Sequence, residues 1–145
     1  MRTEDLERPT VPVTYARLVL EAAAAHGVRS ETVLKAAGLD PHVIDDPNER
    51  MSVLEIALVA DQAMRLTGEP AIGYEIALSS SVTSHGIMGF GMMTSSSLRD
   101  AIQLGIEFMH LRVPVLSAEL RIEGDTAAVS VVETMPLGEF RQTLF

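Results

Sequence analysis

Hydrophobic residues recur at helical spacing over the first two thirds of the chain, and they alternate with polar residues near its end. Capping residues before each helical stretch, and glycine or proline after most of them, sharpen the pattern. It predicts helices over residues 14–26, 30–37, 52–66, 71–78 and 98–111, and a single helical turn over residues 40–44.

Three polar residues mark the beginnings of helices. Thr14 is predicted to be the N-cap of the first helix. Ser52, with Glu55 three residues later, has the pattern of a capping box, and Ser97 with Asp100 has an aspartate variant of it. The helix after Ser97 has a narrow polar stripe and is otherwise mostly apolar, so we expect it to be largely buried.

The period changes to two after residue 115. Apolar and polar residues alternate over 115–123, Gly124 and Asp125 form a tight turn, and residues 126–133 return with Ala127, Val129 and Val131 facing inward. An isolated hairpin is only marginally stable, so helices or further strands must cover it. The sequence therefore predicts an α+β fold, predominantly helical in its N-terminal two thirds and followed by an antiparallel β-hairpin or small sheet.

The centre of the chain lacks charge. The 23 residues from Ile76 to Leu98 contain no charged side chain, in a protein whose charged residues make up 21%. We expect this segment to face protein or a ligand rather than water. It is not a membrane span, because the polar residues 79–81 and 83–85 would be stranded in lipid.

Composition narrows the class of protein. The formal net charge is −9, with 13 acidic and 7 basic residues before position 81 and 7 and 4 after it, so neither half suits a phosphate backbone. The chain has no cysteine, which excludes disulfides and thiolate metal sites and fits a cytoplasmic protein. Its carboxylates are scattered, and we predict neither a catalytic site nor a cofactor. Residues 1–11 are expected to be a disordered tail and residues 12–145 one domain.

The end of the chain is unusually apolar. Phe140 and Leu144 lie four residues apart, as in an amphipathic helix that stops soon after it begins. We expect the chain to be truncated at its C-terminus, with the missing part continuing this domain and adding another.

The charge-poor centre offers two interpretations. Its glycines at 86, 89 and 91 either let helices pack closely, or let the backbone approach a ligand beside an adaptable wall of Met88, Phe90, Met92 and Met93. His85 likewise is either a core histidine bonded to a carbonyl or a ligand contact. The other histidines fit a helix end (His26), a polar turn (His42) and a solvated stripe (His110), and none has the spacing of a metal site.

Residues 86–102, Gly-Ile-Met-Gly-Phe-Gly-Met-Met-Thr-Ser-Ser-Ser-Leu-Arg-Asp-Ala-Ile, resemble a motif in the sensory domain of one group of AraC-type transcription regulators. Stretches similar to earlier motifs of that group occur upstream in the same order, at residues 33–39, 51–54 and 67–73. The hairpin also falls where the group has strands, so the resemblance covers residues 12–145.

The resemblance implies an effector-binding and dimerisation domain of a bacterial transcription regulator. A C-terminal helix-turn-helix domain, absent from this chain, would bind the DNA. We expect a cytoplasmic homo-oligomer that binds a small-molecule effector of unknown identity, not a membrane. The candidate ligand-binding residues are His85, Met88, Phe90 and Met92, with Tyr74 and Phe108 as possible neighbours. The alternative is a dimerisation or protein-interaction domain that binds no ligand.

Overall fold

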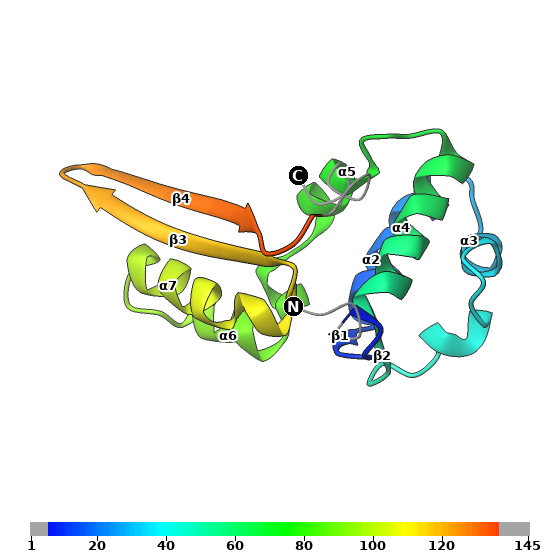
Figure 1. Ribbon diagram of the computed structural model, residues 1–145, viewed down its shortest axis with the longest axis horizontal. Coiled ribbons are helices and arrows are strands. Elements are labelled where there is room, and N and C mark those ends of the chain that lie inside the picture. Colours follow the sequence, from blue (N-terminus) through cyan, green and yellow to red (C-terminus); the bar gives the residue numbers. More distant parts are fainter. Residues whose placement is uncertain (1–5, 137–145) are drawn as a thin grey trace. The chain divides into compact units, whose positions relative to one another are not determined.

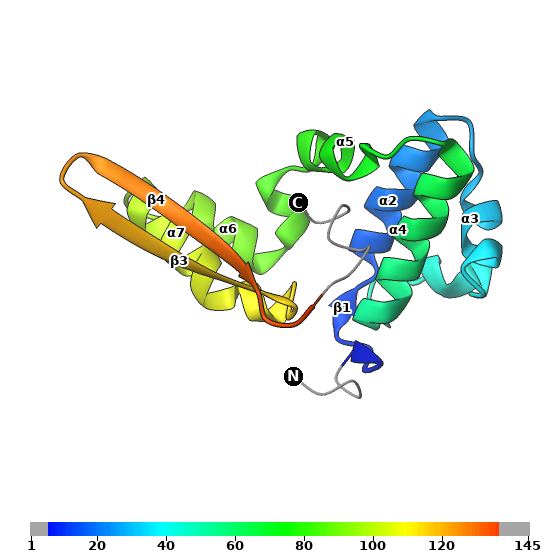
Figure 2. The same cartoon turned by 45° about the horizontal axis from the view of Figure 1, so that its top comes forward.

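A computed structural model describes residues 6–136 of the protein. The described residues fall into two compact units. Residues 6–80 are here called the helical unit, and residues 81–136 are called the hairpin unit (Figures 1 and 2).

The helical unit is built from helices that pack around α2. The helices are α2 (Thr14–Ala25), α3 (Ser30–Ala36), α4 (Val53–Thr67) and α5 (Ile72–Ser79), with a 3-10 turn, η1 (Pro41–Ile44), after α3. Helix α2 contacts α3, α4 and α5, and α3 also contacts α4. Two short antiparallel strands, β1 (Val11–Pro12) and β2 (Arg50–Met51), join the chain before α2 to the chain before α4. Val11, the last residue of the expected tail, therefore lies in a strand.

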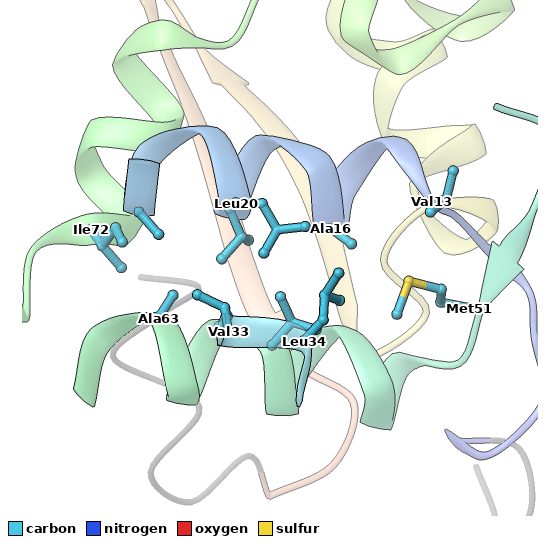
Figure 3. Close-up of a cluster of buried hydrophobic side chains, with 12 residues drawn as sticks. Val13, Ala16, Leu20, Val33, Leu34, Met51, Ala63 and Ile72 are labelled. Atoms are coloured by element: carbon cyan, nitrogen blue, oxygen red, sulfur yellow. The ribbon is translucent and has the colours of Figure 1, made fainter. Parts of the chain in front are cut away.

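The core of the helical unit lies between α2 and the helices around it (Figure 3). Leu20, Leu34 and Ile72 are its largest branched side chains, at 2%, 0% and 0% exposure. Alanines on α2 and α4 keep the two helices close, because a methyl group adds little width to a helix face. The buried cluster comprises Val13, Ala16, Val19, Leu20, Ala23, Val33, Leu34, Met51, Val59, Ala60, Ala63 and Ile72.

The beginnings of α4 and α2 differ in how they are capped. Ser52 and Glu55 form both arms of the capping box: the Glu55 amide donates to Ser52 Oγ at 3.1 Å and the Ser52 amide donates to Glu55 Oε2 at 2.7 Å. The prediction that Thr14 caps the first helix is wrong. The N-cap is Val13, whose carbonyl accepts from the Arg17 amide at 3.1 Å, so the helix begins one residue earlier without a side-chain cap.

The hairpin unit places two short helices beside a long hairpin (Figures 1 and 2). Its elements are η2 (Val82–His85), α6 (Ile87–Met93), α7 (Leu98–Phe108), η3 (Met109–Leu111), β3 (Leu116–Glu123) and β4 (Thr126–Glu133). Helix α6 contacts η2 and α7, and α7 contacts β3. The strands pair antiparallel in one register, from Leu116 opposite Glu133 to Glu123 opposite Thr126.

The α+β fold and the hairpin are confirmed, but two predictions of burial are wrong. Helix α7 contains no buried residue, and Leu98 at its beginning is 76% exposed. On β4, Val129 and Val131 share a face with Leu120 and Ala118 of β3, yet they are 48% and 40% exposed. Helix α7 lies along β3, so the apolar face of β4 has less cover within the hairpin unit.

Candidate functional site

The charge-poor segment, residues 76–98, comprises the end of α5, η2 and α6, and it contains a corner where η2 turns into α6. His85 ends η2, Met88, Phe90 and Met92 lie in α6, and Phe108 ends α7. Five of the six candidate ligand-binding residues therefore belong to the hairpin unit. Tyr74, on α5, belongs to the helical unit and is 67% exposed.

Gly89 is the one buried residue of α6, and it lies against η2. A Cβ atom at position 89 would lie 1.8 Å from the carbonyl oxygen of Val82 and 2.7 Å from its carbonyl carbon. Both atoms belong to the backbone and cannot rotate away. The sequence needs glycine here because α6 packs on η2 through its own backbone.

Two further glycines lie where α6 meets α7. A Cβ atom at Gly91 would lie 3.4 Å from Cδ2 of Leu104, and one at Gly105 would lie 3.1 Å from Cε of Met92. The contact at Gly105 is tight and the one at Gly91 is an ordinary van der Waals distance, so the close-packing interpretation is confirmed for position 89 and not for position 91. Met92 packs against α7 at Gly105.

Arg112 fixes the corner from the chain after η3. Its Nη2 donates to the carbonyl oxygen of His85 at 2.9 Å, across 27 residues of sequence. Gly86 follows with φ +61° and ψ −137°, a region that residues with a Cβ atom rarely occupy. A Cβ atom at position 86 would also lie 3.0 Å from Nη2 of Arg112. Glycine here permits both the turn and the approach of the guanidinium.

The charge at the corner is positive and is not neutralised by a carboxylate. Arg112 is half-buried, and no carboxylate of the described residues lies within ion-pair distance of it. Burial, and secondly the Arg112 charge, lower the pKa of His85 below its usual value of 6.5. His85 is therefore mostly neutral at pH 7.

The charge-poor segment is not withdrawn from water within this chain. Between Ile76 and Leu98 only Gly89 is buried, while Ile87, Phe90 and Met93 are 86%, 58% and 62% exposed. The prediction of burial is wrong because α6 is short and contacts mainly η2 on one side and α7 on another within the hairpin unit. The apolar side chains on the other sides of α6 reach its surface.

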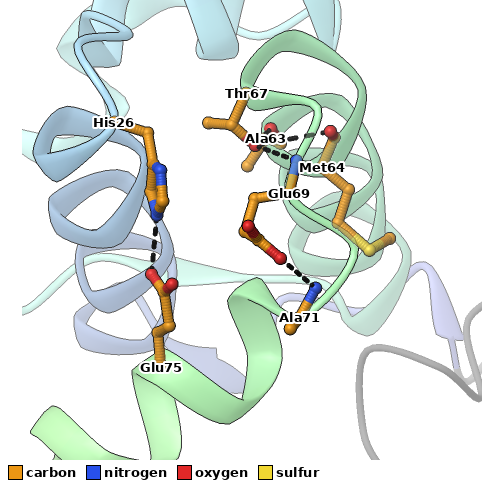
Figure 4. A network of polar contacts seen from close by, with 7 residues as sticks. All are labelled: His26, Ala63, Met64, Thr67, Glu69, Ala71 and Glu75. Carbon is orange, nitrogen blue, oxygen red and sulfur yellow. Dashed lines mark hydrogen bonds and ion pairs between the residues drawn. The ribbon is translucent and has the colours of Figure 1, made fainter.

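The remaining histidines take structural positions. His26 is the C-cap residue of α2, and its Nε2 lies 2.7 Å from Oε2 of Glu75 on α5 (Figure 4). The hydrogen bond to Glu75 raises the pKa of His26 above 6.5. His42 lies in a polar turn with its Nδ1 2.8 Å from Asp45, and His110 is exposed with its Nδ1 2.9 Å from the Glu107 carbonyl.

Figure 4 also shows how the chain between α4 and α5 is held. Thr67 Oγ1 donates to the Ala63 carbonyl at 2.7 Å, and the Ala71 amide donates to Glu69 Oε1 at 2.9 Å. Across residues 6–136, no group of three or more histidine, aspartate or glutamate side chains could hold a metal ion. The chain between α4 and α5 is held by the hydrogen bonds given above.

Arg112 is the residue at this corner that sequence reasoning missed. It lies between Leu111 and Val113, one cation in an apolar stretch. That isolation was the available signal, since a charge among apolar residues requires a partner. Its partner, a backbone carbonyl far away in the sequence, leaves no trace in the local pattern.

Comparison with known proteins now adds the family. Residues 27–145 match the family model of the arabinose-binding domain of AraC transcription regulators, the N-terminal domain. This chain belongs to that family. Its members are domains of transcription regulators, not enzymes.

Three relatives of this AraC-type domain are transcription regulators by name. The chain is 35% identical over 128 residues to the ornithine utilization regulator of Pseudomonas aeruginosa, which covers 88% of the chain and 38% of that protein. It is 29% identical over 101 residues to uncharacterized HTH-type transcriptional regulators of Mycobacterium bovis and Mycobacterium tuberculosis, covering 69% of the chain and 29% of each. The chain thus spans about a third of the length of these regulators.

Among the residues that the structure describes, no helix of this AraC-type domain combines the length and the apolar character needed to cross a membrane.

Proposed function

We propose that this chain is the ligand-sensing part of an AraC-type transcription regulator of the cytoplasm. In the longer protein it would bind a small effector, associate with a second copy and control a separate DNA-binding domain. The family match supports the regulatory role. The net charge of −9 supports a division of labour in which another domain contacts DNA.

We place the effector at the corner formed by His85, Gly86 and Arg112, with Phe90 as an exposed apolar contact. The observation that carries this proposal is the half-buried guanidinium of Arg112, which lacks a carboxylate partner in the described part of the chain. A partly desolvated cation is stabilised by an anion, and a guanidinium binds a carboxylate with two parallel hydrogen bonds. The proposed effector therefore carries a carboxylate.

The corner is also a suitable place from which to report occupancy. Arg112 links the chain between α7 and β3 to the His85 carbonyl at the end of η2. An anion that accepts hydrogen bonds from Arg112 would compete with that carbonyl and so change the strength of this link. An effector shifts the regulator only if it binds one arrangement of the longer protein better than another. Competition for Arg112 supplies such a difference.

A thermal-shift titration tests the proposal with small molecules of known charge. The probes are L-ornithine, because a relative carries that name, 1,4-diaminobutane, which is ornithine without its carboxylate, and L-arabinose. Saturation at 100 times the dissociation constant stabilises a protein by about 2.7 kcal/mol, roughly 5–10 °C for a chain of this size. We expect ornithine, or one member of a panel of other amino acids and organic acids, to give such a shift. The diamine should give none.

Arg112→Gln should abolish the response, and Arg99→Gln is the matched control. Arg99 is exposed on α7 in the same unit, so its loss changes the net charge by the same amount without touching the corner. A shift that survives Arg112→Gln would refute the proposed position of the effector.

The second candidate is an interaction domain that binds no small molecule. The exposed apolar side chains of the hairpin unit favour it, among them Ile87, Leu98 and Leu111 at 86%, 76% and 55% exposure. A flat thermal response to amino acids, sugars, fatty acids and aromatic acids would support this candidate over the sensing role.

A further inference from the structure

Strand β4 has a free edge. It pairs with β3 along its whole length, and the sheet that they form has two strands in the described part of the chain. Every second residue of β4 therefore directs its backbone N–H and C=O groups away from β3, where no described strand receives them. Such an edge is a template for another strand.

The two strands of the hairpin differ in how they are protected. Strand β3 carries Glu119, Arg121 and Glu123, and α7 lies against it. Charged side chains of this kind prevent edge-to-edge pairing in natural sheets. Strand β4 has no charged residue and no proline from Thr126 to Val132, and each of these residues is exposed. One edge of the hairpin is protected and the other is open.

We propose that β4 pairs antiparallel with β4 of a second copy of this chain, giving a four-stranded sheet. The proposal names the surface for the self-association in the proposed function, but it does not depend on an effector. A two-fold axis through the β4 edges satisfies the free backbone groups of both copies at once. Because β3 is charged, the sheet stops at four strands and does not grow into a fibre.

Charge distinguishes the two registers in which β4 overlaps longest with its copy. A two-fold axis perpendicular to the sheet keeps α7 of both copies on one face, and it requires one residue to lie opposite itself. An axis at Val129 would set Glu133 opposite Asp125, two carboxylates. An axis at Ser130 sets Glu133 opposite Ala127 and Val129 opposite Val131, so no like charges meet and β-branched residues face each other. We therefore place Ser130 on the axis.

The self-pairing also changes the position of β4 from the edge of a sheet to its centre. Val129 and Val131, 48% and 40% exposed in one copy, would become the centre of the four-stranded sheet. A two-stranded hairpin is marginal alone, whereas three or more strands with a hydrophobic face are stable. The second copy thus supplies the further strands that a stable sheet needs.

Sedimentation velocity of the 145-residue chain tests the pairing. We expect a concentration-dependent monomer–dimer equilibrium. Ser130→Lys should weaken the dimer by about tenfold or more, because it brings two ammonium groups together at the axis. The matched control is Ser117→Lys, an equally exposed position on the same face of β3, which should leave the equilibrium unchanged. Circular dichroism establishes that both variants fold.

A cysteine at the axis tests the register directly. The chain contains no cysteine, so Ser130→Cys can form a disulfide only between two copies. Residues directly opposite in an antiparallel pair have Cα atoms about 4.5–5.5 Å apart, which a disulfide can span. We expect a covalent dimer under mild oxidation from Ser130→Cys and far less from Ser117→Cys.

Two results would overturn the proposal. One is a chain that stays monomeric at every concentration, which would assign the β4 edge to a strand from the rest of the longer regulator. The other is a dimer that Ser130→Lys leaves intact and that Ser130→Cys does not cross-link. Neither result bears on the effector titration, so the two proposals fail separately.

Discussion

Replacing Gly89 by alanine should destabilise the hairpin unit, although alanine is the better helix former. Gly89 lies inside α6, where alanine gains about 0.5–1 kcal/mol over glycine when nothing else changes. Here the added Cβ atom would lie 1.8 Å from the Val82 carbonyl oxygen. To reach even 3.0 Å, the shortest separation that real Cβ atoms show, η2 and α6 must move apart by 1.2 Å.

The magnitude follows from what has to move. The obstructing atoms are backbone of η2, so no side-chain rotation relieves the contact, and separating η2 from α6 opens the packing around the corner. Insertion of one carbon into a tightly packed site costs typically 1–3 kcal/mol and sometimes more, when the neighbours must shift. The contact is with backbone, so we take the upper end of this range, about 3 kcal/mol. After the helix preference of about 0.5–1 kcal/mol is subtracted, we expect a net loss of roughly 2–2.5 kcal/mol in the free energy of unfolding of the hairpin unit.

Hydrogen exchange measures this loss where it occurs. Both tyrosines of the chain, Tyr15 and Tyr74, lie in the helical unit, so their fluorescence does not report on the hairpin unit. Exchange of the Phe90 amide, which donates to the Gly86 carbonyl at 3.1 Å, does report on it. That exchange should quicken in Gly89→Ala.

Gly91→Ala is the matched control, because its Cβ atom would meet Leu104 Cδ2 at 3.4 Å, an ordinary contact with a flexible side chain. Equal protection in the two variants would refute the close-packing explanation of Gly89.

Three further predictions concern single side chains. Glu75 raises the pKa of His26, so the ion pair stabilises the helical unit fully below the unfolded pKa of 6.5. This stabilisation is lost as the pH rises through the higher pKa of the folded state. His26→Gln should therefore flatten the decline in melting temperature between about pH 6 and pH 8. Ser52→Ala should lower the free energy of unfolding by about 1–2 kcal/mol in urea titrations, because Ser52 is only 3% exposed and its loss leaves the Glu55 amide without its acceptor. Phe90→Ala should weaken effector binding in calorimetry more than it lowers stability, because Phe90 is 58% exposed; an unchanged affinity would remove Phe90 from the site.

The sequence predicted the elements whose signals are local. The capping box at Ser52 depends on residues three apart, and the alternation over 116–133 depends on neighbours two apart. Both were found with nearly correct bounds, since short-range chemistry determines them. Helix α6 was missed because its two glycines and three methionines give no helical stripe. Contacts with Val82 and Leu104, outside the helix itself, explain why those glycines suit it.

The charge-poor segment shows why a missing charge is a weak guide to burial. A charged side chain costs free energy only where water is excluded, so its absence is compatible with either a buried or an exposed position. Burial also needs an element with a broad face and a neighbour to cover it, as α2 has with α4. Helix α6 has seven residues and buries one of them. The sequence therefore located an apolar segment correctly, and it could not say which other surface covers that segment.

Arg112 provides the stronger argument for a site at this corner. An arginine in an apolar stretch is usually matched by a carboxylate, yet the hairpin unit directs its guanidinium to the His85 carbonyl, beside a glycine that leaves room for it. A backbone carbonyl satisfies one of five donors and neutralises no charge. Burial, and secondly the Arg112 charge, lower the pKa of His85, so no second positive charge arises at neutral pH. The effector that we propose for this corner is therefore a small molecule with a carboxylate at one end, for Arg112, and apolar atoms at the other, for Phe90.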